Sequence, residues 1–108
     1  MNELLAKLDS ALDFTNAFTW EGTARYYLDH YDEKQIILNI EGNSTIEHSG
    51  DKQGIYSNVN DLVGTSSVID NKTYTIIEAI VDKITTNDHL GDGEENIHIS
   101  GLVSIKIT

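Results

Sequence analysis

The stretch at residues 87–96, NDHLGDGEEN, combines four acids, two glycines and one histidine, a composition that suits a calcium-binding loop. An EF-hand loop places oxygen ligands at positions 1, 3 and 5, glycine at position 6 and a bidentate acid at position 12. Counted from Asp88, position 5 is Asp92, but positions 3 and 12 are Leu90 and Ile99. The spacing therefore argues against a calcium site.

Other catalytic or metal-binding patterns are also missing from the sequence. There is no cysteine, which excludes disulfides, thiolate metal sites and cysteine nucleophiles. No GxSxG motif is present, and the GDG segment at 91–93 would repel a phosphate through its neighbouring acids. The histidines do not have the spacing of zinc ligands, and the adjacent acid pairs at 32–33 and 94–95 would point to opposite faces of a strand. We therefore expect no metal, no cofactor and no enzymatic activity.

Charge is the clearest compositional signal. Eighteen acids against seven bases give a net charge of −11 and a sequence pI of about 4.4. Such a surface should repel nucleic acids and anionic membranes, because binding to phosphates depends on Lys and Arg. It should attract a basic protein partner and accelerate association with it. The N-terminus, MNELLAKLDSALDF, has neither a signal peptide nor a membrane span, so cytoplasmic residence is expected.

The first half of the chain predicts a helix followed by strands. Leu4, Leu5, Leu8, Ala11 and Leu12 form one apolar stripe, which indicates a helix over about residues 2–13. The aromatic residues that follow are expected to form a seam between helix and sheet. Alternation of apolar and polar residues then predicts strands at about 22–30 and 35–41, which form an antiparallel hairpin, and a short strand at 44–48 after a break at Gly42.

The second half predicts three more strands. The segment at 53–69 is weakly patterned, with the better strand at about 62–69 and a tight turn at 70–72. Residues 73–84 fit a helical stripe, but their content of Ile, Thr and Val favours a long strand. The run at 96–107 alternates clearly, with Gly101 as a candidate bulge. These elements predict one α+β domain over residues 1–108, with the helix packed on an antiparallel sheet of five or six strands. A half-open barrel is the alternative arrangement.

Two groups of acids are candidates for binding a basic partner, because carboxylates regularly spaced on strands can imitate the phosphates of a nucleic acid. The residues from 84 to 105 include four acids and no Lys or Arg, and the first hairpins offer a second negative surface. The predicted partner-binding residues are Asp88, Asp92, Glu94 and Glu95 in the first group, and Asp29, Asp32, Glu33, Glu41 and Glu47 in the second. Neutralising the first group together should weaken such a complex and leave the fold intact.

In its size, charge and α+β layout, the chain resembles the phage-encoded inhibitors of host defence, the anti-CRISPR proteins among them. This resemblance rests on no shared motif and assigns no residue; it implies a small inhibitor that occupies the nucleic-acid-binding surface of a partner. A second interpretation is a structural or self-associating subunit, for example of a phage particle, because strands with apolar residues on both faces favour homo-oligomers. A third is a ligand-binding half-barrel with a pocket lined by Trp20, Tyr26 and Tyr56.

Overall fold

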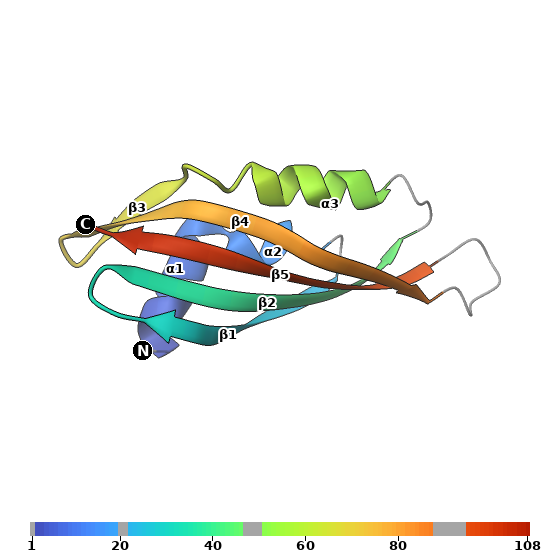
Figure 1. Cartoon of the computed structure of the whole chain (residues 1–108), viewed down its shortest axis with the longest axis horizontal. Helices are drawn as coiled ribbons and strands as arrows, with labels where there is room; N and C mark the ends of the chain where they lie inside the picture. Colours follow the sequence, from blue (N-terminus) through green and yellow to red (C-terminus); the bar gives the residue numbers. More distant parts are fainter. Residues whose placement is uncertain (1, 20–21, 47–50, 88–94) are drawn as a thin grey trace.

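One five-stranded antiparallel sheet organises the fold in the computed structural model, which describes residues 2–19, 22–46, 51–87 and 95–108. The strands lie in the order β1-β2-β5-β4-β3, and the helices lie on one side of the sheet and along the β3–β4 edge (Figure 1). The elements are α1 Asn2–Leu12, α2 Phe14–Ala17, β1 Thr23–Tyr31, β2 Gln35–Ile46, α3 Asp51–Asn60, β3 Ser66–Ile69, β4 Lys72–Asn87 and β5 Glu95–Ile107. The predicted α+β class and antiparallel sheet are confirmed.

The predicted N-terminal helix is present as α1, and a second helix follows it at once. Leu5, Leu8 and Leu12 of α1 are buried, as the stripe predicted. Asp13 takes a left-handed conformation (φ 57°) that ends α1 and starts the one-turn helix α2. The Asp9 carboxylate stabilises the start of α2 by accepting hydrogen bonds from the backbone N–H of Thr15 (3.0 Å) and from its hydroxyl (2.8 Å). The aromatic link predicted by the sequence is therefore partly helical.

The first hairpin is confirmed, but its second strand is longer than predicted. Strand β2 continues without a break from Gln35 to Ile46, so the sequence was wrong to divide it at Gly42 into two strands. The residues at 47–48 of the predicted short strand lie outside the described part of the chain. Ile36, Leu38 and Ile40 face the helices and are fully buried, as their alternation predicted.

Residues 72–87 form the strand β4, which confirms the strand over the helical alternative. Asp70 and Asn71, both with positive φ, make the predicted tight turn between β3 and β4. Two register irregularities lie on β4, one between Ile76 and Glu78 and one between Val81 and Lys83. Gly101 is paired directly with Val81, so the bulge that the sequence placed at Gly101 lies on the neighbouring strand instead.

The helix α3 was not predicted, and the strand expected at 62–69 is reduced to Ser66–Ile69. Ile55, Val59 and Leu62 are buried against the core at a spacing of four and three residues, while the positions between them are mostly polar. Such a narrow apolar stripe gives little helical signal in the sequence, and Gly54 weakens it further. The packing of these three side chains on the sheet therefore decides the conformation.

Two glycines let the chain after α2 lie directly on the sheet. A Cβ atom on Gly101 would lie 2.3 Å from Cε1 of the Phe18 ring, and one on Gly42 would lie 2.4 Å from the Phe18 carbonyl oxygen. Real Cβ atoms do not approach other atoms so closely, so both positions require glycine. Phe18 is consequently fully buried between the helices and the central strands β2 and β5.

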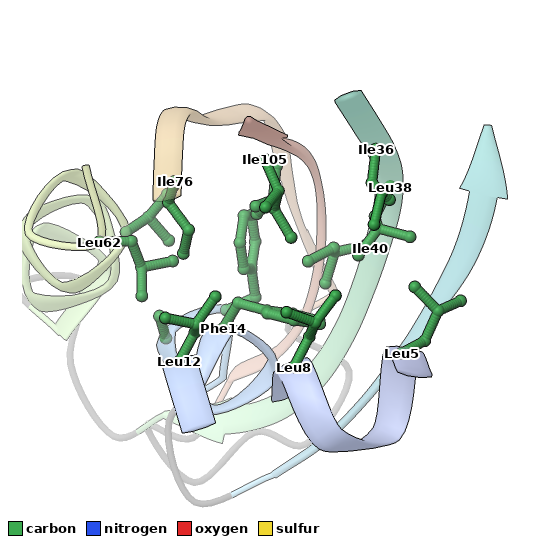
Figure 2. Packing of buried hydrophobic residues seen from close by; sticks show 14 of the residues in the cluster. Leu5, Leu8, Leu12, Phe14, Ile36, Leu38, Ile40, Leu62, Ile76 and Ile105 are labelled. Carbon is green, nitrogen blue, oxygen red and sulfur yellow. The ribbon is translucent and has the colours of Figure 1, made fainter. Parts of the chain in front are cut away.

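Apolar side chains from the helices and from one face of the sheet fill the space between them. Figure 2 shows Leu8, Leu12 and Phe14 pointing from the helices towards β2, β4 and β5. The sheet does not close into a barrel, since β1 and β3 are its two edges. Within the described ranges, no helix is both long and apolar enough to cross a membrane.

The substitution Gly101→Ala should reduce the free energy of unfolding by about 1–3 kcal/mol, because the new methyl group overlaps the Phe18 ring and the backbone carbonyl oxygen of Ile80. Urea unfolding followed by circular dichroism would measure the loss. Ser100→Ala, on the adjacent and half-buried residue, is the matched control and should change stability by less than about 0.5 kcal/mol. An unchanged midpoint for Gly101→Ala would contradict the close packing of Phe18.

Candidate interaction surfaces

Most of the first group of predicted acids lies outside the described residues. This applies to Asp88, Asp92 and Glu94, and also to Glu47 of the second group. The backbone of Glu95 begins β5, where it pairs with Ile46 of β2. The part of these acids in binding stays a prediction from the sequence.

The other predicted acids of the first hairpin do lie near one another. Asp29, Asp32 and Glu33 are exposed at the end of β1 and in the turn that leads to β2. Asp32 forms the turn, because its Oδ1 accepts hydrogen bonds from the backbone N–H groups of Lys34 (2.7 Å) and Gln35 (2.9 Å). Its Oδ2 lies 2.9 Å from Nε2 of His30. The hydrogen bond from His30 and those from the backbone lower the pKa of Asp32 below its ordinary value.

Glu41 does not belong to this negative patch. Its carboxylate lies 3.8 Å from Nε of Arg25, the residue directly opposite on β1, and it is half-buried on the sheet. The cross-strand arrangement neutralises its charge locally. Glu41 therefore contributes to the pairing of β1 with β2 more than to a free anionic surface.

The face of the sheet that points away from the helices, here called the open face, carries charges of both signs. Arg25, Lys83 and Lys106 lie on it together with Glu41 and Glu78. The guanidinium of Arg25 lies over the ring of Tyr27, 5.8 Å from its centroid. A uniformly negative sheet face, the arrangement best suited to imitating phosphates, is thus not found among the described residues.

A row of mostly apolar side chains crosses the middle of the open face. The register aligns Tyr27 of β1 with Asn39 of β2, Asn39 with Leu102 of β5, and Leu102 with Ile80 of β4. We call Tyr27, Leu102 and Ile80 the apolar row. Tyr27 and Ile80 are 46% and 42% exposed and Leu102 is half-buried, so the row is partly open to solvent.

The helices form an acidic groove that the sequence did not reveal. Its volume is about 290 Å³, and its lining combines two carboxylates, two amides and two apolar side chains: Asp13, Asn16, Ala17, Asn58, Asp61 and Leu62. Asp13 accepts a hydrogen bond of 2.7 Å from the side-chain amide of Asn16. Among the residues that the structure describes, no cation lines the groove. The missed helix α3 explains why the sequence did not bring residues 58–62 to α2.

The described histidines do not assemble a metal site. Nδ1 of His98 lies 2.9 Å from Oδ1 of Asn43 on the neighbouring strand, and His30 pairs with Asp32. No cluster of three or more His, Asp or Glu side chains with the geometry to hold a metal occurs among the residues that the structure describes. His48 and His89 lie outside those residues.

The third interpretation was a ligand pocket lined by aromatic residues, but the described ones among them do not line a common pocket. Tyr26 packs on Phe14 with ring centroids 5.5 Å apart, and burial raises its pKa with a smaller contribution from the charge of Asp9. Tyr56 is 45% exposed on α3, and Trp20 lies outside the described residues. Neither Tyr26 nor Tyr56 lines the acidic groove.

Comparison with protein-family models, with curated protein sequences and with solved structures found no match to this chain.

The pKa of Asp32 should lie below its ordinary value of 3.8 in the folded protein, and carboxyl NMR during an acid titration would measure it. Because the folded pKa is lower than the unfolded one, this group stabilises the fold above about pH 4, and the stabilisation is lost as the pH falls through the folded pKa. His30→Gln should raise the pKa of Asp32. Asp29→Asn is the control, because it removes a nearby carboxylate but none of these bonds; an unshifted Asp32 would contradict the turn geometry.

Proposed function

We propose that the protein is a small acidic binding protein of the inhibitor type, which occupies a basic, nucleic-acid-binding surface of a partner protein in the cytoplasm. It acts by binding and not by catalysis. The observation that carries the proposal is the uncompensated negative charge. The net charge is −11, and the ion pairs within the described ranges are those of Arg25 with Glu41 and of His30 with Asp32.

The distribution of charge favours the turn and the helix layer as the contact region. The groove between α2 and α3 carries Asp13 and Asp61 and has no cation among its described lining residues, and its amide oxygens can accept hydrogen bonds from a Lys or Arg side chain. The β1–β2 turn adds Asp29 and Glu33. The open face, in contrast, holds three of the seven cations and would be less attractive to a basic surface.

Among the alternatives, self-association has a specific observation in its favour, which is the apolar row on the open face. A phage-particle subunit would be one protein of that kind. The ligand-binding half-barrel is not proposed, because the sheet stays open and the layer between it and the helices is filled.

Capture of partners from the source cell by the immobilised protein tests the proposal. Capture of a nucleic-acid-binding protein should weaken at least about tenfold between low and high salt, because the attraction is electrostatic. An added DNA or RNA duplex should compete for the same partner. Capture that depends on neither salt nor nucleic acid would contradict the proposal.

Three pairs of substitutions with equal charge change locate the contact. We expect Asp13→Asn with Asp61→Asn, and Asp29→Asn with Glu33→Gln, to lower the affinity for the captured partner about tenfold or more. Glu78→Gln with Asp82→Asn on β4 is the matched control and should have a smaller effect. Equal losses from all three pairs would show a response to total charge alone and would contradict a defined acidic contact.

A further inference from the structure

The apolar row on the open face is flanked by charges that lack partners within the described chain. On β4, Glu78 and Lys83 lie on opposite sides of Ile80, in the two neighbouring rows of the open face. The register places Ser104 beside Glu78 and Ser100 beside Lys83. Neither charged side chain takes part in the ion pairs of the described residues. An exposed apolar strip between opposite charges is the pattern of an interface with a self-complementary partner.

We propose that a second copy of this chain packs on the open face, with a two-fold axis that runs across the strands along the apolar row. The axis lies in the plane between the two sheets, so each residue of the row meets its own counterpart. Ile80 contacts Ile80 of the other copy, and Leu102 and Tyr27 do the same. The interface lies on the open face and shares only the His30–Asp32 pair with the proposed binding function, which uses the helix layer and the acids of the β1–β2 turn.

The same axis brings the charges into opposite-sign contact. Rotation exchanges the rows on either side of the apolar row, so Lys83 of each copy lies over Glu78 of the other. At the β1 edge, Arg25 lies over the His30–Asp32 pair of the other copy. A symmetric interface repeats every favourable contact twice.

The alternative face-to-face axis, which runs along β5, gives poorer contacts. It would place Ile80 over Asn39 and Glu78 over Ile37 of the other copy, according to the register of β2, β5 and β4. It would also place Lys83 over Glu41, but Glu78, which has no ion pair among the described residues, would be buried against an isoleucine side chain and lose hydration without gaining a partner. The axis along the apolar row places Glu41 over Ile37, but Glu41 keeps its ion pair with Arg25 of its own copy. The contacts of the apolar row with itself, together with the Lys83–Glu78 pairs, therefore select the axis along the apolar row.

The size of the open face is sufficient for a specific dimer. The open face spans four strands, spaced about 4.8 Å apart, and five rows of side chains, spaced about 6.8 Å apart along the strands. Its area is therefore on the order of 600 Å². Two such faces bury about 1,200 Å², at the lower end of specific interfaces, so we expect a dissociation constant in the micromolar range. The two sheets should pack with their strands within about 30° of each other.

Sedimentation equilibrium of the wild-type chain over a range of concentrations tests the dimer. A monomer–dimer equilibrium supports the proposal, whereas a monomer at about 200 µM overturns it, since that concentration far exceeds the expected dissociation constant. Ile80→Asp should raise the dissociation constant at least about thirtyfold, because it places two carboxylates at the axis. Val68→Asp is the matched control: Val68 is 68% exposed on β3, more than two rows from the axis, and its substitution should leave the dimer intact.

A charge exchange tests the geometry even if Ile80→Asp fails to fold. Glu78→Lys alone and Lys83→Glu alone each place like charges over one another, and each should weaken the dimer about tenfold. The double variant Glu78→Lys with Lys83→Glu restores opposite charges across the axis and should recover the wild-type dissociation constant. A dimer that ignores the single changes, or that the double variant weakens further, overturns the proposed axis.

Discussion

The close approach of Phe18 to the central strands is the contact on which the arrangement of this fold depends. A phenylalanine ring and its carbonyl lie directly on β5 and β2 because Gly101 and Gly42 present no side chain there. This contact fixes the height of α1 and α2 above the sheet, which in turn brings Leu8, Leu12 and Phe14 into the core. It also fixes the position of α2 beside α3. The acidic groove between these helices therefore depends on the two glycines in the strands.

The sequence predicted the fold where one physical pattern dominated. Strict alternation at 35–41 and 96–107 identified the two central strands and their buried faces, because a period of two fixes which side chains point inward. It failed where tertiary packing decides the conformation. Gly42 reads as a strand break, yet it is the one residue type that fits beneath Phe18. Among the described side chains of α3, Ile55 and Val59 are the buried apolar ones, and Leu62 follows just after the helix, so packing on the sheet determines the conformation of this segment.

The candidate surfaces were harder to predict for the same reason. A list of acids does not distinguish those that hold the chain together from those that are free. Asp9 organises the start of α2, Asp32 forms a turn and Glu41 balances Arg25 across two strands. Asp13 and Asp61 come together only because α2 and α3 are neighbours. The apolar row likewise needs the register of four strands, which no single stretch of sequence contains.

The order of the strands has a consequence for the rate at which this chain folds. The β1–β2, β3–β4 and β4–β5 pairings join neighbouring segments, whereas the β2–β5 pairing joins residues as far apart as Gln35 and Lys106. Bringing these segments together costs loop-closure entropy before the contacts between them form. The pairing of β2 with β5 should therefore limit the folding rate. The chain contains no proline, and its refolding is therefore free of the slow isomerisation that often obscures this step. The joining of the β1–β2 hairpin to the three-stranded unit β3–β4–β5 should be visible as a single kinetic phase.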